Sequence, residues 1–479
     1  MKRRIGMTRS TAIGLGLAAA AGVALAAVGG VLDTSFGSGG TVVTATGGAN
    51  AVAIQVDNKI VVAGYGPDDF IGGSHFTVAR YDTRGALDTS FSADGIVTTV
   101  VSATKLEYAT AVAIQPDGKI LVAGYNDTSD SNPGNFVLIR YDQNGVPDTA
   151  FDGDGIVVTP IPASGPNSRA EAMALQADGK IVVVGASGNG VWDIVLVRYN
   201  ADGSLDTSFD TGGDGDGIVI APGGGSFMNA VAVQPDGRIV VAGSSIGGAS
   251  GSDVIVQRYT SGGVLDTTFS GDGIASFNVP DSVSGGAYAL ALQPDGHIVV
   301  AGTTGSAGTI DFLLLRFDTG GALDTTFDGD GVVVTDFPFT GGSDPVNRGR
   351  ALVIQPDGRI LIVGDTYANN VDPSARDLAL ARYNADGTPD NTFSLDGRAT
   401  TSVSNGRDYG NAVALRASGR IVVGGSALTS SSNSLVAQYL ANDADSNDVA
   451  ESWDVTPDAF DFTDVDAVAA SSLQLSNTI

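Results

Sequence analysis

The strongest constraint on the fold of this chain is a segment of about sixty residues that recurs along most of its length. Its clearest marker is a short turn sequence, which reads QVDN at Gln55, QPDG at Gln115, QADG at Gln176, QPDG at Gln234, Gln293 and Gln355, and RASG at Arg416. Successive markers lie 58 to 62 residues apart. A period this regular indicates one supersecondary unit that stacks against copies of itself.

Each repeat predicts four β-strands. In the copy that begins at Ala111, the apolar runs are AVAIQ (Ala111–Gln115), KILVAG (Lys119–Gly124), NFVLIRY (Asn135–Tyr141) and IVVT (Ile156–Thr159), with turn residues between them. Val, Ile and Thr favour strands, whereas Asp and Gly favour turns. Helix formers are scarce, since the chain has only three Glu residues. We therefore expect an all-β fold.

The first strand of every repeat is rich in Ala: AVAIQ twice, then AMALQ, AVAVQ, ALALQ, ALVIQ and AVALR. Small side chains suit the innermost strand of a β-propeller blade, where neighbouring blades converge. A single repeat is too small to bury its own core. The pattern predicts a seven-bladed β-propeller of four-stranded antiparallel blades over residues 31–440.

The two ends of the repeat region complement each other. LDTSFGSGGTVVT (Leu32–Thr44) has the sequence of the end of a repeat, whereas the copy after Ala412 stops once its third strand, near Ser434–Leu440, is complete. We predict that the strand Thr41–Thr44 completes the last blade and closes the ring, which removes a free sheet edge.

A charge pattern supports this closure. In six copies the third strand ends in Arg, and an Asp follows eight residues later: Arg80 and Asp88, Arg140 and Asp148, Arg198 and Asp206, Arg258 and Asp266, Arg316 and Asp324, Arg382 and Asp390. We expect a charge-assisted contact in each pair. In the last copy Gln438 replaces the Arg, and its predicted partner is Asp33 from the other end of the repeat region.

The repeats also carry a family resemblance. Units with QPDGKI, RYD, NADGSLDTSF and DGDGIVVT resemble the delta-60 repeat, a bacterial β-propeller repeat family without a settled function. The resemblance covers roughly residues 31–440 and implies the propeller fold but no activity. The sequence departs from the pattern at Arg416–Arg420, at Gln438 and at Pro389–Phe393.

The segments outside the repeats predict export and a separate tail. Residues 1–26 combine a basic start, an uncharged stretch and a small-residue cleavage site, as in a Sec-type signal peptide. This favours a secreted protein, or one located in the periplasm or at the cell surface, with no membrane span once the signal is removed; an uncleaved anchor is the alternative. Residues 441–451 are an acidic linker, and 452–479 resemble an incomplete immunoglobulin-like module.

Composition excludes several classes of function. The formal net charge of -28 argues against nucleic-acid binding, which needs clustered basic residues. The absence of Cys excludes disulfides, thiolate metal sites and a Cys nucleophile. Nothing in the pattern requires an oligomer.

The inventory of side chains predicts no catalytic residues. The chain has two His residues, His75 and His297, and neither a Ser/His/Asp triad nor a multi-His metal centre can be assembled from this inventory. An enzyme acting on polysaccharide through paired carboxylates remains an alternative. Its candidate acids are Asp127, Asp130, Asp281, Asp344, Asp372 and Asp408, none of them paired in a recognisable motif.

Asp-Gly clusters raise the question of calcium, which prefers oxygen-rich, flexible loops. The candidate ligands are Asp152, Asp154, Asp214, Asp216, Asp328 and Asp330. Asp and Gly also suit the tight turn before the fourth strand, and we favour that role because the motif recurs with the scaffold. No cofactor is expected, with calcium as the open alternative.

Alternating antiparallel strands place the two nearly constant connections of each repeat on one face and the two variable loops on the other. The variable face is therefore the one free to carry function. We expect a binding or scaffold protein whose ligand, an extracellular glycan or protein, is held there by charge and ring stacking; a structural or adhesive cell-surface role is the alternative. The candidate ligand-binding residues are Lys105, Tyr108, Arg169, Trp192, Tyr288, Arg348, Arg350, Arg407 and Tyr409.

Overall fold

The computed structural model describes residues 29–66, 74–127, 134–162, 167–189, 191–221, 225–248, 251–278, 285–306, 309–337, 345–368, 376–428 and 431–441. The predicted signal peptide, nearly all of the linker and the tail lie outside these residues. Within them, the chain forms strands and turns and no helix, so no helix there could span a membrane.

The strands form antiparallel groups in chain order. The first groups are β2 (Ala49–Ile54), β3 (Ile60–Tyr65), β4 (Phe76–Tyr81) and β5 (Ile96–Thr99); β6 (Leu106–Ile114), β7 (Ile120–Asp127), β8 (Asn135–Tyr141) and β9 (Ile156–Pro160); β10 (Asn167–Leu175), β11 (Ile181–Asn189), β12 (Val191–Tyr199) and β13 (Ile218–Ala221). The others are β14 (Phe227–Val233), β15 (Ile239–Gly248), β16 (Gly251–Tyr259) and β17 (Ile274–Phe277); β18 (Gly286–Leu292), β19 (Ile298–Ser306), β20 (Thr309–Phe317) and β21 (Val332–Thr335); β22 (Pro345–Ile354), β23 (Ile360–Ala368), β24 (Asp377–Tyr383) and β25 (Arg398–Thr401); and β26 (Arg407–Leu415), β27 (Ile421–Leu428) and β28 (Ser432–Tyr439), which β1 (Thr41–Thr44) joins.

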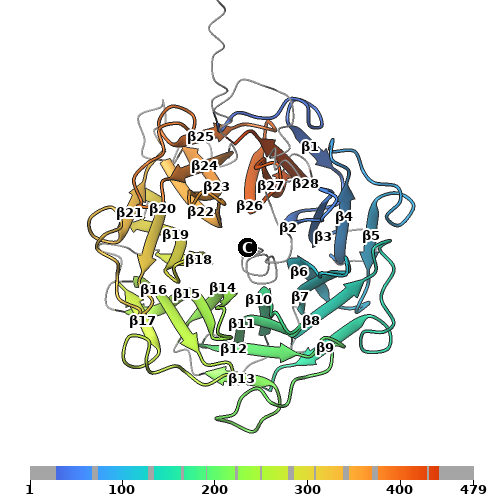
Figure 1. Ribbon diagram of the computed structural model, residues 1–479. Coiled ribbons are helices and arrows are strands. Elements are labelled where there is room, and N and C mark those ends of the chain that lie inside the picture. The colour runs from blue at the N-terminus through green and yellow to red at the C-terminus, as the bar shows by residue number, and fades with distance from the viewer. Residues whose placement is uncertain are drawn as a thin grey trace, which may run out of the picture.

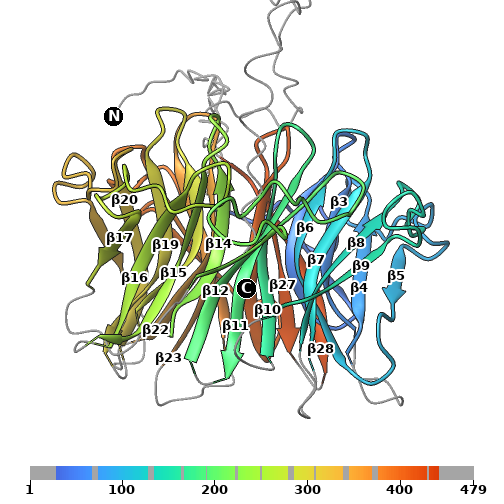
Figure 2. The ribbon, with the colours of Figure 1, turned by 90° about the horizontal axis from the view of Figure 1, so that it is seen from below.

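These groups stand around a common centre, which is the arrangement of a β-propeller (Figure 1). The first strand of each group is innermost and the fourth is outermost, as the Ala-rich first strand predicts. Figure 2 shows the sheets standing side by side along the central axis. A single parallel bridge between Ile310 and Val346 links β20 to β22, so two neighbouring blades count as one sheet by hydrogen bonding.

The N-terminal strand pairs with the last strand of the chain. β1 is antiparallel to β28, with Thr41 opposite Ala437 and Thr44 opposite Ser434. In Figure 1 the blue β1 accordingly lies beside the red β28. The pairing predicted from the split repeat is therefore present.

Apolar side chains fill the space between neighbouring blades. The Phe that ends each LDTSF-type segment is buried, at Phe36, Phe91, Phe151, Phe209, Phe269, Phe327 and Phe393. One core cluster joins Phe36, Val52 and Val62 to Val422 and Val436, and so packs the first blade of the chain against the last.

The predicted Arg–Asp pairs are all formed. In each, the Arg Nε or Nη2 atom lies 2.6 to 2.8 Å from the Asp carboxylate, and the Arg is buried. In five of the six pairs the same Arg also donates from Nη1 to a backbone carbonyl of the next blade: Arg80 to Gln143, Arg140 to Ala201, Arg198 to Ser261, Arg258 to Thr319 and Arg316 to Ala385. The pair thus fixes the turn and also joins two blades.

In the last blade, two residues have exchanged places: Gln438 ends the third strand where other blades have Arg, and Arg416 stands where other blades have the marker Gln. Gln438 donates to Asp33 at 2.7 Å, as predicted, but it is too short to reach the next blade. Arg416, which replaces the marker Gln, donates to the carbonyl of Thr83 at 2.8 Å and lies 5.6 Å from the ring centroid of Phe36. The guanidinium therefore comes from the turn after β26 instead of from β28, while a contact with the next blade is kept.

This exchange predicts that substitutions at positions 416 and 438 have strongly non-additive effects on the unfolding free energy. Arg416→Gln removes the bond to Thr83 and should cost about 2 kcal/mol, the scale of a charged hydrogen bond. Gln438→Arg alone buries a second guanidinium beside Arg416 and should cost about as much. The double exchange restores the arrangement of the other blades, so its unfolding free energy should lie within about 0.5 kcal/mol of the parent. Urea unfolding of the four proteins checks this; a double variant weaker than both singles would contradict it.

Candidate functional site

The structure places most predicted ligand-binding residues in strands rather than in the loops where we expected them. Tyr108 lies in β6, Arg169 in β10, Trp192 in β12, Tyr288 in β18, Arg348 and Arg350 in β22, and Arg407 and Tyr409 in β26. The expectation was wrong because the first strand of most blades starts several residues before its Ala-rich part. In the β6–β9 blade, β6 begins at Leu106 instead of Ala111. Strand positions hold side chains in a fixed register.

Each first strand contains a β-bulge five residues before the marker. The pairing of β6 with β7 skips Thr110, and that of β26 with β27 skips Asn411. The side chain of the skipped residue usually bonds to the next blade. Asn50 donates to the Ala109 carbonyl, Thr110 to Ala170, Asn229 to Ala287 and Asn411 to Ala49, at 2.7 to 2.9 Å. We call these bonds the bulge latches.

Three blades replace the latch residue. The skipped positions hold Glu171 in β10, Tyr288 in β18 and Arg350 in β22. Tyr288 and Arg350 belong to neighbouring blades, and together with Arg348 they line a pocket of about 230 Å³. Two positions that hold latch residues in other blades therefore line a cavity here. All three lining residues are among the candidates predicted from the sequence.

The charge around this pocket is positive. Arg350 Nε lies 2.6 Å from one carboxylate oxygen of Asp365, and Arg376 Nη1 lies 3.0 Å from the other. The pKa of Arg350 is raised: burial alone would lower it, but the charge and hydrogen bond of Asp365 outweigh burial. One carboxylate therefore faces two of these guanidinium groups, while Arg348 adds a third positive charge next to them.

Two tyrosines hold these guanidinium groups in place. Arg376 lies 4.0 Å from the ring centroid of Tyr367 and 5.1 Å from that of Tyr409. Arg350 lies 5.5 Å from Tyr409, and Arg348 lies 5.8 Å from Tyr367. Cation–π contacts of this kind orient an Arg without neutralising it. We call Tyr288, Arg348, Arg350, Tyr367, Arg376 and Tyr409 the basic cluster.

Three other candidates, Tyr108, Arg169 and Trp192, belong to a second group that we call the aromatic arc, which also comprises Tyr65, Tyr125 and Phe227. The ring centroids of Tyr65 and Tyr108 are 5.6 Å apart, and those of Tyr108 and Tyr125 are 5.3 Å apart. Trp192 and Phe227 are 4.9 Å apart. Arg169 lies between the two sets, 5.7 Å from Tyr125 and 5.8 Å from Trp192. The arc extends over neighbouring blades from β3 to β14.

Glu171 was not identified as a site residue from the sequence. Its side chain is buried, and Oε2 has no hydrogen-bond partner within the described part of the chain. Burial raises its pKa to about 8, although the charge of Arg169 opposes the shift. The group is therefore largely protonated at neutral pH. Its place in the bulge was visible in the sequence, as the one acid at a position that otherwise holds Asn, Thr, Tyr or Arg.

The other predicted residues lie apart from the pocket. Lys105 is in the turn before β6, and Arg407 begins β26. His75 is buried with Nδ1 3.2 Å from Glu107, whose carboxylate also accepts backbone N–H bonds from Val101 and Ser102. His297 takes the role of the Lys or Arg found at this turn in other blades, with Nε2 3.3 Å from Asp324.

The Asp-Gly residues mostly serve turns. Asp154, Asp216 and Asp330 each accept a bond from the backbone N–H two residues later, at the start of the fourth strand. Asp152 and Asp328 hold left-handed backbone angles, with φ of 50° and 49°. Among the described residues, one acidic group is compact enough for a metal ion: Asp214 and Asp216 with Asp210, which was not predicted from the sequence.

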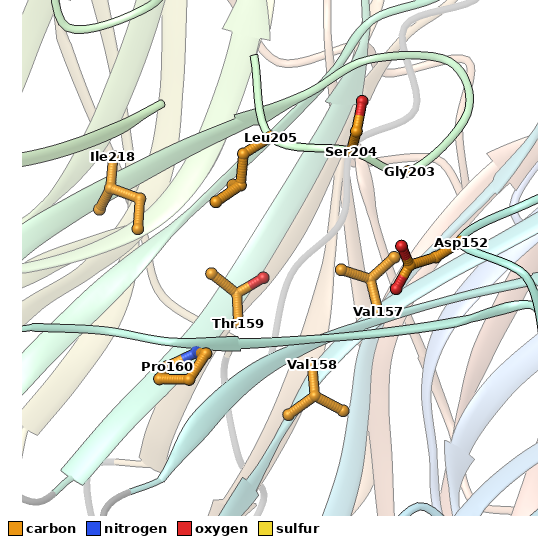
Figure 3. Close-up of a pocket in the computed structure, with 9 residues that line it drawn as sticks. All are labelled: Asp152, Val157, Val158, Thr159, Pro160, Gly203, Ser204, Leu205 and Ile218. Atoms are coloured by element: carbon orange, nitrogen blue, oxygen red, sulfur yellow. The ribbon is translucent and has the colours of Figure 1, made fainter. Parts of the chain in front are cut away.

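Asp152 also lines a groove of about 300 Å³ between two neighbouring blades (Figure 3). The other lining residues are Val157, Val158, Thr159, Pro160, Gly203, Ser204, Leu205 and Ile218. Asp152 is the one charged residue among the described residues of this lining. The groove lies at the outer strand β9 and the turn before β13, away from the basic cluster.

Fold and site together define a β-propeller with a small basic pocket near the inner strands of two blades. Six segments match the family model described as "Domain of unknown function (DUF5122) beta-propeller", at residues 55–91, 115–151, 176–209, 234–269, 293–327 and 355–393. The repeats along the chain thus match this β-propeller family, which is consistent with the delta-60-like resemblance. Every matched segment runs from a marker Gln to the buried Phe, and the exchanged copy at Arg416 is not among them.

Comparison with curated proteins gave no match. Among solved structures, a protein of unknown function from Dyadobacter fermentans is 12% identical, with 70% of this chain and 95% of that chain covered and a TM-score of 0.42. An ulvan lyase of polysaccharide lyase family PL25 is 12% identical, with 84% and 96% covered and a TM-score of 0.45. An endo-arabinase from Bacteroides thetaiotaomicron is 11% identical, with 57% and 93% covered and a TM-score of 0.32. These similarities are too weak to support an argument about function.

Proposed function

We propose that this protein is a secreted, non-catalytic binding propeller that holds an anionic group of an extracellular ligand in the pocket of Tyr288, Arg348 and Arg350. The observation that carries the proposal is the replacement of two neighbouring latch residues by Tyr288 and Arg350, which line a cavity with Arg348. Arg presents a planar fork of donors that suits carboxylate and sulfate groups.

The electrostatics favour an anion over a neutral ligand. The chain as a whole is strongly acidic, yet Asp365 faces two guanidinium groups of the basic cluster and Arg348 adds a third. Because Asp365 already orients Arg350, that side chain needs little reordering when a ligand binds, and preorganisation of this kind lowers the entropic cost of binding.

We also propose that the blades close into a ring of seven. The pairing of β1 with β28, the bond from Asn411 to Ala49 and the bond from Arg416 to Thr83 support this closure. A closed ring would hold the inner strands of the two pocket blades at a fixed separation, which a binding site shared by two blades requires.

Binding of the chain without residues 1–26 to an array of acidic and neutral glycans tests the proposal. We expect acidic glycans to be retained and neutral ones to be lost. Arg348→Gln should weaken retention about tenfold, the equivalent of about 1.4 kcal/mol. Chelation of calcium should have no effect, since the described lining of the proposed pocket contains no carboxylate ligand for a metal.

The matched control is Arg84→Gln. Arg84 is an exposed arginine in the constant turn between β4 and β5, on the opposite face, and its loss changes the net charge equally. Equal weakening by both variants would indicate a nonspecific charge effect and would refute the pocket. Retention of no glycan at all would favour the alternative of a structural spacer.

A further inference from the structure

We infer that the ligand is a linear acidic polysaccharide, which the basic cluster holds by a carboxylate or sulfate group and the aromatic arc holds by its sugar rings. This inference rests on the proposed function and names the class of ligand. It depends on observations at the aromatic arc, which the proposed function does not use.

The arc and the basic cluster lie at one level of the propeller. In six blades, the residue seven positions before the marker pairs with a residue at the equivalent position of the second strand. The pairs are Tyr108 and Tyr125, Arg169 and Ala186, Phe227 and Ser244, Gly286 and Thr303, Arg348 and Asp365, and Tyr409 and Ser426. Paired strand residues project to the same side of a sheet. These positions therefore form one layer that passes from blade to blade.

The layer is divided into two chemically different parts. Tyr108 and Phe227 carry rings at this register, with Arg169 between them, whereas Arg348 and Tyr409 belong to the basic cluster. The blade between the two parts has Gly286, which carries no side chain, opposite Thr303. A Cβ at Gly286 would lie 2.1 Å from Ser244 Oγ, so the two neighbouring blades approach closely here. The arc thus leads from Phe227 past Gly286 to Tyr288 and the pocket.

The arc side chains are accessible to a ligand. Tyr65, Tyr108, Tyr125, Arg169, Trp192 and Phe227 are all partly exposed, whereas the rings that build the blade core are buried. Rings at an inner strand end would normally be buried, or replaced by polar residues on a strongly acidic surface. A partly exposed run of rings that contact one another is typical of a binding surface.

The chemistry of this surface selects among anionic polymers. Aromatic rings offer flat apolar faces to the C–H groups of a sugar ring, and Arg169 can bond to its hydroxyl or acidic groups. An acidic peptide would use the arginines but would have no planar units to match successive rings. Nucleic acid has such units, but its dense phosphate charge conflicts with the net charge of -28. The arrangement therefore fits a chain of sugars with spaced acidic groups.

Calorimetry with size-fractionated oligogalacturonates tests the inference, because each unit carries one carboxylate on a planar-faced ring. For the parent protein we expect affinity to rise with chain length by tenfold or more between the dimer and the longest fraction. Trp192→Ala combined with Phe227→Ala should abolish this rise and leave dimer affinity unchanged. Arg348→Gln should weaken every length, and Arg84→Gln should change none.

The outcomes separate the two proposals. If Arg348→Gln weakens binding and the ring variants retain the full length dependence, the arc has no role and the inference is wrong while the anion pocket stands. If Arg348→Gln has no effect, the pocket itself is wrong. Sulfated dextran is the second probe. If the protein binds neither oligogalacturonate nor sulfated dextran, both proposals are wrong. Polyglutamate bound with the same length dependence would show that sugars are not required and would overturn the inference.

Discussion

A chain that starts at residue 46, and so lacks β1 and the segment before it, is expected to lose most of its stability. The removed segment includes Phe36, which is buried, and the strand that pairs with β28. Loss of one buried Phe costs about 3–5 kcal/mol. Loss of the bonds from Gln438 and Arg420 to Asp33 adds about 1.5–3 kcal/mol. The total approaches the whole stability of a typical domain.

The same truncation exposes a sheet edge. Without β1, the backbone N–H and C=O groups of β28 that face away from β27 lack partners, and such an edge pairs with other chains. We expect association in multi-angle light scattering, together with a large fall in the urea midpoint. A synthetic peptide of residues 29–45, added in trans, should restore both the monomer and the midpoint.

Removal of residues 1–26 alone is the control, and it should leave the midpoint unchanged. A chain starting at residue 46 that stays monomeric with the parent midpoint would mean that β1 does not complete the last blade. The proposed ring closure would then fail as well.

The second prediction concerns Glu171, whose pKa is raised to about 8 by burial, against the opposing charge of Arg169. An unfolded chain titrates this group near 4.5. Between pH 4.5 and pH 8 the folded state binds this proton more tightly than the unfolded state does. The contribution of protonated Glu171 to stability is therefore complete below pH 4.5 and is lost as the pH rises toward 8. Glu171→Gln removes the titration and keeps the shape of the side chain.

The expected effect is large because a tenfold difference in proton affinity between the folded and unfolded chains corresponds to about 1.4 kcal/mol. Near pH 5 the variant should match the parent, and near pH 8 it should be more stable by about 2–4 kcal/mol. Urea midpoints across this range check the prediction. If the urea midpoint of the parent does not fall below that of the variant as the pH rises, the prediction is wrong.

Glu107 provides the matched control. It is also a buried glutamate, but its carboxylate accepts bonds from the backbone of Val101 and Ser102. Glu107→Gln turns one acceptor oxygen into a donor and leaves a buried N–H unsatisfied. It should therefore destabilise the protein throughout this pH range, opposite in sign to Glu171→Gln.

Much of the fold could be predicted from the sequence because the repeat supplies seven observations of one unit. The four strands of the repeat and the Arg–Asp pairs depend on residues at fixed local spacing, and the contact between Gln438 and Asp33 was predicted because the first and last copies are each incomplete. The length of the first strand could not be predicted in this way. Leu106–Ala109 lie before the Ala-rich pattern, and their strand conformation depends on pairing with β7 on the N-terminal side of the bulge at Thr110.

The candidate site was predicted only as a set of side chains on one face. The sequence pointed to Tyr288, Arg348 and Arg350 individually, and the structure brought them together in one pocket while leaving Lys105 and Arg407 outside its lining. Asp365 was not predicted because nothing in the spacing reveals that it faces Arg350 and Arg376. The compact Asp210, Asp214 and Asp216 group likewise depends on how one loop folds back.

The repeat and its strands could be predicted from the sequence because they follow from local periodicity, and the complementary ends follow from comparing the first and last copies with the others. The tertiary structure alone decided which residues of different blades meet. Arg416 and Thr83 are separated by most of the repeat region, and Tyr288 and Arg350 by one full repeat. Contacts at such separations depend on how the sheets are placed around the axis, which the repeat pattern does not specify.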